Sequence, residues 1–224
     1  MARRRTTDLD GLLDVAEQLA TAGDPEGLTL RRLAVEAGAS NGSIYHAFSS
    51  KEELLARVWI RAARRLLTEQ TARVESAINS ASSEEEAEDA VVSAALWPVE
   101  FALEHPSTAR LFFGQRRDQL FSPRGLPSEI TEELDDVQRL FTGLLITLAR
   151  ARWGRTDRVA VEAIAVCVVD LPGGLMQRKL VAGQALGPQL PTQIEAACRA
   201  LLALELPPPP TRKSRTTQEK EPRR

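Results

Sequence analysis

The stretch LTLRRLAVEAGASNGSIYHAFSSKEELL, residues 28–55, decides the fold of this chain. Thr29, Ser40 and Ser50 are residue types that begin helices, because their side-chain oxygens accept hydrogen bonds from free backbone N–H groups. Ser50 and Glu53 also have the spacing of a capping box, in which each side chain satisfies the other residue's backbone N–H group. The stretch therefore predicts three helix starts in close succession.

Only Gly38, Ala39 and Ser40 separate the expected helices over residues 30–37 and 41–47. So tight a turn needs a residue at positive φ, which glycine adopts without strain. Ala34 is small enough to let the next helix cross closely. This arrangement predicts a helix-turn-helix.

The helical period divides residues 41–48 into two faces. Ile44, Ala47 and Phe48 are expected to fill the core with Leu30 and Leu33. The outward hydroxyls can donate to phosphates, Asn41 and His46 can reach base edges, and glycine lets a backbone approach closely. The candidate DNA contacts are Thr29, Ser40, Asn41, Gly42, Ser43, Tyr45, His46 and Lys51.

Charge supports a DNA-facing surface at this helix. Residues 38–50 hold no acidic side chain, although residues 1–37 hold seven. The competing interpretation is that the polar residues are only caps and turns of an ordinary helical head. Arg3, Arg4 and Arg5 form either an arm that enters a minor groove or a solvated terminus, and the sequence leaves both readings open.

These residues resemble the DNA-binding head of the tetracycline-repressor (TetR) family of bacterial transcription regulators over roughly residues 8–60. The resemblance implies a homodimer that binds a palindromic operator and usually represses. One departure is the number of acids in the first helix. The matching residues are Thr29, Leu33, Ala34, Ala37, Gly38, Ser40, Gly42, Ile44, Tyr45, His46, Phe48, Ser50, Lys51, Glu52 and Leu54, and the first-helix acids are Asp8, Asp10, Asp14 and Glu17.

Nearly every other segment also has helical periodicity, and none has sustained strand alternation, so we predict an all-α fold. An N-terminal three-helix head is expected to join a larger ligand-binding and dimerisation domain through a linking helix. Residues 80–89 are interpreted as a linker with the first turn of the next helix. The expected helices cover residues 9–20, 51–79, 86–104, 107–115, 127–152, 156–181 and 189–205, and the expected domains are 1–50, 51–206 and a disordered basic tail, 207–224.

The body is expected to hold an unidentified small-molecule effector. Pro98 should kink its helix and open space beside the nearby aromatic residues. The alternative is a plain aromatic core, and Arg116 with Arg117 is taken as solvated. The candidate ligand-binding residues are Trp97, Phe101, Phe112, Phe113 and Phe141. The resemblance implies that the last two helices pair with those of a second copy. Asp170 is expected to be an N-cap or kink residue.

Composition sets further limits. The net charge is −2, so any contact with a polyanion must rest on a local surface. Cys167 and Cys198 are expected to be buried free thiols, with a disulfide between them as the alternative. The longest apolar run, 163–169, is too short for a membrane span, so we expect a cytoplasmic protein without a membrane partner.

No motif in the sequence points to catalysis. His46 and His105 are the only histidines, and neither has an acidic partner nearby in sequence. We therefore expect no catalytic residue, metal site or cofactor. The competing function classes are a helical protein-interaction module and a small helical enzyme.

Overall fold

The computed structural model describes residues 9–21, 28–114 and 116–209, and every regular element in those ranges is a helix. The all-α prediction is therefore confirmed. The helices are α1 (Leu9–Thr21), α2 (Leu30–Glu36), α3 (Asn41–Ala47), α4 (Lys51–Ser80), α5 (Glu84–Glu104), α6 (Pro106–Gly114), α7 (Arg117–Leu120), α8 (Ser128–Trp153), α9 (Arg158–Ala165), the π-helical segment η2 (Val166–Asp170), α10 (Leu171–Val181) and α11 (Leu190–Leu202).

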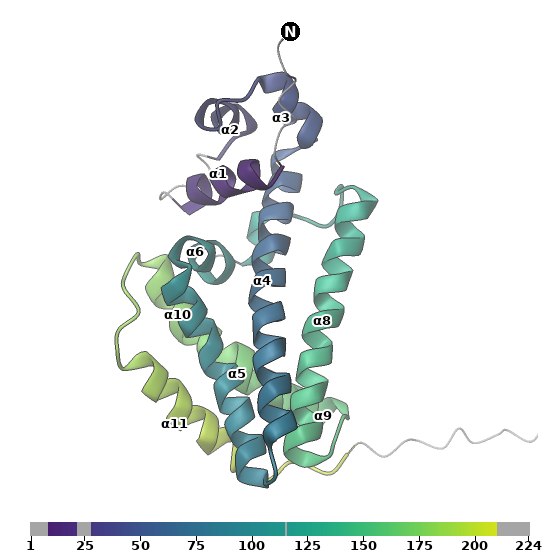
Figure 1. The fold of residues 1–224 in the computed structure, drawn as a ribbon, viewed down its shortest axis with the longest axis vertical. Coiled ribbons are helices and arrows are strands. Elements are labelled where there is room, and N and C mark those ends of the chain that lie inside the picture. Colours follow the sequence, from purple (N-terminus) through teal and green to yellow (C-terminus); the bar gives the residue numbers. More distant parts are fainter. Residues whose placement is uncertain (1–8, 22–27, 115, 210–224) are drawn as a thin grey trace, which may run out of the picture.

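Figure 1 shows a head and a body joined by one long helix. The helices α1, α2 and α3 form the head at one end of the long axis. The helix α4 begins beneath the head and runs the length of the body, where it packs against α5 and α8. The helices α1 and α6 are also in contact, so the head rests on the body at two places.

The predicted helix starts are present. The Thr29 hydroxyl accepts a hydrogen bond from the backbone N–H of Arg32 (3.1 Å), and the Ser50 hydroxyl accepts one from Glu53 (3.0 Å). The Glu53 side chain differs from the capping-box prediction: its carboxylate accepts from the backbone and hydroxyl of Ser49, one residue before the cap. Arg57 donates to the same carboxylate at 2.9 Å, so this buried charge is fully satisfied.

The turn and the core of the head follow the sequence prediction. Gly38 has φ of 61°, the left-handed conformation that the short turn requires. Leu33, Ile44 and Phe48 are completely buried in the core of the head. The inner face of α3 therefore holds the helix against the head and fixes which of its residues point outward.

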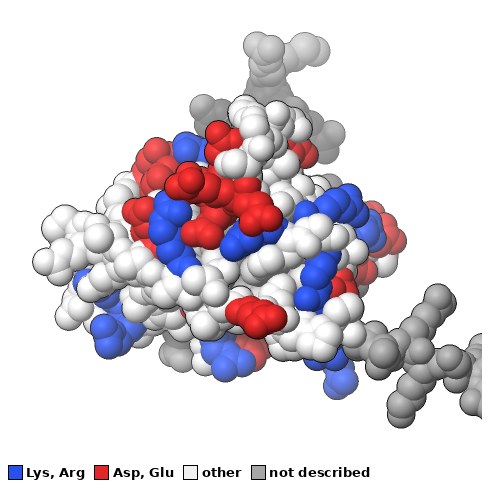
Figure 2. All heavy atoms as spheres, turned by 90° about the horizontal axis from the view of Figure 1, so that it is seen from below, with Lys and Arg blue, Asp and Glu red and all other residues white. Residues whose placement is uncertain are grey.

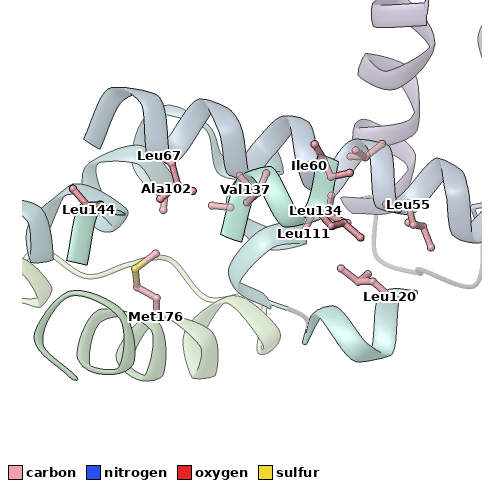
Figure 3. Packing of buried hydrophobic residues seen from close by; sticks show 14 of the residues in the cluster. Leu55, Ile60, Leu67, Ala102, Leu111, Leu120, Leu134, Val137, Leu144 and Met176 are labelled. Carbon is pink, nitrogen blue, oxygen red and sulfur yellow. The ribbon is translucent and has the colours of Figure 1, made fainter. Parts of the chain in front are cut away.

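The same apolar core continues through the body. Figure 3 shows Leu55, Ile60 and Leu67 of α4 among side chains from α6, α7 and α8, including Leu111 and Leu134. All five are buried. Burial at this level stabilises each large aliphatic side chain by about 1.5–3 kcal/mol, so α4 is firmly packed from Leu54 to Val74.

Two boundaries differ from the sequence predictions. Residues 80–89 form a short connection followed by the first turns of the next helix, as the sequence indicates, because α4 ends at Ser80 and α5 begins at Glu84, two residues before the predicted start. The Ser83 hydroxyl caps α5 by accepting from the backbone of Glu86 (3.2 Å). The three acids in the first turn suit the positive end of the helix dipole.

The helix at residues 158–181 is continuous but widens into a π-helical segment at Val166–Asp170. Pro172 follows directly; it lacks an N–H group and its ring clashes with the carbonyl four residues earlier, which favours the wider turn. Asp170 has helical backbone angles and makes no capping bond, so the N-cap reading of this residue is wrong.

This continuous helix also changes the expectation about membrane-length segments. Arg158–Val181 is long and apolar enough to cross a membrane by length and composition, because the helix continues past the short run at 163–169. Buried helices of soluble proteins meet the same criterion. Only 33% of its apolar window is buried inside this chain, so much of its apolar surface is fully or partly accessible in the monomer.

The two cysteines are free and buried, on η2 and α11. A hydrogen bond with the Cys167 sulfur, together with burial, raises the pKa of Cys198 far above its usual value. A thiol that stays protonated is a poor nucleophile. The prediction of buried free thiols thus agrees with the structure.

Candidate nucleic-acid interface and effector cavity

The outward face of α3 is open to solvent. Asn41, Gly42, Tyr45 and His46 are all exposed, and Tyr45 keeps 61% of its surface accessible. An aromatic side chain of this size on a surface normally packs part of its ring away from water. The four residues therefore contribute little to the packing of the head and are free to meet a partner.

The hydroxyl groups beside this face are partly used within the chain. The Ser40 hydroxyl accepts from the backbone of Ser43 (3.1 Å), and the two hydroxyl oxygens lie 2.9 Å apart. One O–H hydrogen of this pair remains available, as does that of Thr29, whose oxygen accepts from Arg32. The helix caps and a phosphate could thus share the same hydroxyls.

Gly42 is not required by the packing of the head. A Cβ atom built at this position would meet only the Ser40 hydroxyl, at an ordinary 3.8 Å. Its backbone lies within the regular helix α3, and no positive φ demands glycine. The absence of a side chain is therefore unexplained by the fold, and it leaves α3 accessible to a closely approaching backbone.

The acids of α1 have a structural role. Arg61 of α4 forms ion pairs with Asp14 and Glu17, each at 2.8 Å. Glu17 also accepts a hydrogen bond from the Thr108 hydroxyl of α6. These contacts join the head to α4 and α6. The junction between head and body therefore accounts for Asp14 and Glu17, two of the first-helix acids that depart from the resembling family.

The opposite end of the molecule carries a different charge pattern. Figure 2 shows that end, where acidic side chains gather with arginines among them. Arg199 lies 2.8 Å from Asp89, and Arg152 lies 3.4 Å from Glu88. Clustered acids repel phosphate, so a nucleic acid would approach the head instead. Arg3–Arg5 and most of the tail lie outside the described residues.

A second candidate site is an apolar cavity of about 410 Å³ in the body. It lies between α4, α6, α8 and the η2–α10 segment, and its size falls within the range of small-molecule sites. Phe112, Phe113 and Phe141 line it, as the sequence analysis expected. Pro98 lines it as well, within a helix that continues through the proline.

Trp97 and Phe101 do not line this cavity, contrary to the expectation. Both are buried with Leu66 in a small cluster behind it. The Trp97 indole N–H donates to the Leu66 carbonyl oxygen at 3.1 Å, which points the ring along α4. The rotation of α5 about its axis, which no local sequence pattern reveals, turns these two rings into the core.

Two residues of the cavity were missed in the sequence. Trp59 of α4 lines it and stacks on Phe112, with ring centroids 5.2 Å apart. Arg117 lines it too and lies 5.6 Å from the Trp59 ring, so its interpretation as merely solvated is incomplete. Trp59 stands in the apolar stripe of α4, and only the position of α6 and α7 reveals its role.

His105 occupies the end of α5, where its backbone N–H donates to the Phe101 carbonyl (2.8 Å). It faces a polar pocket at the head–body junction, with Arg61 and Thr108. Across the residues that the structure describes, no group of three or more His, Cys, Asp or Glu side chains could hold a metal ion.

Together these features define a class of protein: an exposed helix-turn-helix head on a helical body with an apolar cavity. Residues 12–58 match the family model described as bacterial regulatory proteins, tetR family. This match shows that the head is similar to that family over the helix-turn-helix and the start of α4.

Two curated proteins are similar to part of the chain. Both are uncharacterised HTH-type transcriptional regulators of Mycobacterium tuberculosis, and each is 38% identical over 65 residues. The similarity covers 29% of this chain and 32% of theirs. The chain thus matches about a third of the length of these relatives.

Solved structures extend the likeness to the body. A TetR transcriptional regulator from Rhodococcus sp. RHA1 is 22% identical with a TM-score of 0.54, over 87% of this chain and 94% of that one. The regulator FadR from Bacillus subtilis, in complex with stearoyl-CoA, is 13% identical with a TM-score of 0.60, over 88% of this chain and 98% of that one. At these identities the likeness shows the fold.

Proposed function

We propose that this chain is a DNA-binding transcriptional regulator that acts as a homodimer on a palindromic operator and represses until an effector binds. The exposed face of α3 carries the proposal. Asn41, Gly42, Tyr45 and His46 lie outside the core, free of acidic neighbours within residues 38–50. The family match includes this helix.

The small size of α3 supports a dimer. One seven-residue helix contacts few base pairs, so a regulator of this class gains specificity by placing two such helices on half-sites about a helical turn or more apart. A two-fold symmetric protein then reads a two-fold symmetric sequence. The operator is accordingly a palindrome in this proposal.

The surface of α9–α11 supports the location of the dimer interface. Val166 is 40% exposed within a strongly apolar helix. A Cβ atom built at Gly173 or Gly174 would meet nothing within 4 Å, so a second helix could approach closely there. An apolar helix face this open requires a partner, and we assign it to a second copy.

The cavity supports an effector. Its apolar walls and few polar groups are typical of ligand sites, and the TetR-fold protein FadR is seen with stearoyl-CoA. The nearby junction of Glu17, Arg61 and Thr108 connects α6, which lines the cavity, to the head. Movement of α6 on ligand binding would therefore reach α1.

The proposal gives the chain a cytoplasmic location, where chromosomal DNA is found, and assigns it no reaction and no cofactor. Turnover of a small substrate that depends on His105 would contradict this part. Binding to lipid vesicles through residues 158–181, in place of self-association, would contradict the dimer assignment.

The experiment for the DNA role replaces the two largest side chains on the outward face of α3. The double variant Tyr45→Ala, His46→Ala should keep the fold, because both residues are exposed. Its affinity for the specific operator should fall at least about tenfold, since contacts to bases and phosphates are each worth roughly 1–3 kcal/mol. Mobility shift on the operator measures the loss; unchanged specific binding would show that this face is not the DNA contact.

A further inference from the structure

The cavity in the body has walls of one chemical character. Its lining is mainly aromatic and aliphatic, and no acidic side chain contributes to it. A cationic ligand would lose its hydration there without gaining an opposite charge, which is strongly unfavourable. The representative apolar residues are Trp59, Leu66, Leu67, Phe113, Val137 and Phe141.

Arg117 supplies the only charged side chain among the residues that line the cavity. It is exposed, at the start of α7, and its guanidinium lies 5.6 Å from the Trp59 ring. The nearby Asp118 is engaged by Arg116 instead, at 2.9 Å. No described acid pairs with Arg117, so its planar set of N–H donors is available to a carboxylate at the cavity mouth.

Gln70 places a hydrogen-bond acceptor in the lining of the same cavity. Its side chain is only 4% exposed, and its Nε2 donates to the Ala94 carbonyl oxygen at 2.8 Å. That bond fixes the orientation of the amide and leaves Oε1 without a hydrogen bond to any described residue. An acceptor without a partner in an otherwise apolar cavity favours a ligand that brings a donor to it.

The guanidinium of Arg117 and the amide of Gln70 lie at different positions along the axis of α4. Trp59, beside Arg117, and Gln70 are eleven residues apart on this helix, which corresponds to about 16 Å along its axis. The other polar lining residues are Gln138, whose amide is 3.3 Å from the Thr142 hydroxyl, and Gln177. The remaining described lining residues are apolar.

We propose that the effector is an elongated apolar carboxylate that carries a hydroxyl or N–H group remote from the acid. The carboxylate binds Arg117 at the mouth, the apolar chain fills the cavity, and the remote donor binds Oε1 of Gln70. This ligand class rests on the effector role proposed above and deepens it.

A series of ligands of one chain length tests the class on the unmodified full-length protein. The probes are ω-hydroxydodecanoate, dodecanoate, methyl dodecanoate and dodecylamine, followed by calorimetry below their micellar concentrations. We expect affinity to fall in that order, with the amine at least tenfold weaker than dodecanoate. Equal or tighter binding of the amine or the methyl ester than of dodecanoate would overturn the carboxylate assignment.

Arg117→Gln isolates the contact at the mouth, and Arg116→Gln is its matched control. Both variants lose one arginine from adjacent exposed positions, but only Arg117 lines the cavity. Arg117→Gln should weaken dodecanoate about tenfold, the usual worth of a charge-assisted hydrogen bond, and leave methyl dodecanoate unchanged. If both variants lost the same dodecanoate affinity, the acid would be attracted by the general positive charge of this surface and not by a specific contact with Arg117.

Gln70→Leu isolates the contact with Gln70. It should remove the preference for ω-hydroxydodecanoate over dodecanoate while leaving dodecanoate affinity nearly unchanged. Because leucine cannot donate to the Ala94 carbonyl, thermal unfolding is measured in parallel. If the variant does not fold, the comparison of the two acids on the unmodified protein decides: no preference for the hydroxylated acid overturns the Gln70 assignment.

Operator binding, measured separately, distinguishes this inference from the proposed function. If the protein binds its operator but none of the probes, the ligand class is overturned and the regulatory role stands. Carboxylate binding by a protein that shows no specific DNA binding leaves the ligand class standing and overturns the regulatory role.

Discussion

At the scale of single residues, Gly42 is not required by the fold, but its lack of a side chain suits the proposed DNA binding. Nothing around it within the chain excludes a side chain, and it lies in regular helix. Glycine in a helix costs about 0.5–1 kcal/mol relative to alanine. A residue that weakens its own helix without a packing reason indicates selection by a partner, which in the proposed function is a closely approaching DNA backbone.

We therefore expect Gly42→Ala to raise the free energy of unfolding slightly and to weaken operator binding several-fold. Gly143→Ala is the matched control, because Gly143 is also exposed in a helix with open space around it, on α8. The control should gain similar stability and bind the operator normally. Denaturant unfolding and mobility shift measure the two effects, and normal operator binding by Gly42→Ala would contradict the close approach.

At the scale of elements, the start of α9 depends on one ion pair. The Asp157 carboxylate caps the helix by accepting a hydrogen bond from the backbone N–H of Val159 at 3.1 Å. The Arg155 guanidinium donates two more hydrogen bonds to the same carboxylate, at 2.7 and 2.9 Å. The hydrogen bond from Arg155 is the main cause that lowers the pKa of Asp157 to about 2.

A lowered pKa means that the folded protein binds the proton less tightly than the unfolded chain. Asp157 therefore contributes stability above about pH 4, and this contribution is lost as the pH falls toward 2. Asp157→Asn should be less stable than the unmodified protein at pH 7, with the difference shrinking between pH 4 and pH 2. Unfolding followed by circular dichroism across this range measures it; a difference independent of pH would contradict the lowered pKa.

The elements also show what sequence reasoning can reach. The helix-turn-helix was predictable because its signals are local: Ser40 caps α3, and Gly38 takes the positive φ of the turn. The cavity lining was predicted only in part. Trp97 fills the core while Trp59 faces the cavity, since the rotation of α5 and the position of α6 depend on packing between helices far apart in sequence.

Arg117 illustrates a second limit. An arginine after another arginine is usually solvated, and only the short helix α7 brings this one to the cavity mouth beside Trp59. The domain boundary at residue 50 stays a prediction, as do the roles assigned to the individual DNA contacts. The π-helical segment, by contrast, follows from Pro172 once the helix is known to continue through it.

At the scale of the whole molecule, the apolar face on α9–α11 is expected to pair two copies. Val166→Glu would place a charge in that interface, where burial without a partner costs several kcal/mol. The variant should be monomeric in sedimentation. Leu140→Glu, on an exposed position of α8 outside the proposed interface, is the control and should remain dimeric. A Val166→Glu protein that still dimerises would contradict the assignment.

The central claim is that two copies of α3 read a two-fold symmetric DNA sequence. Selection of random duplexes by the full-length protein tests it most directly, followed by affinity measurements over a range of salt concentrations. The account predicts enrichment of one inverted repeat, with binding that weakens steeply as salt rises. Recovery of no enriched sequence, or of a sequence without two-fold symmetry, would contradict it and favour a head that binds protein.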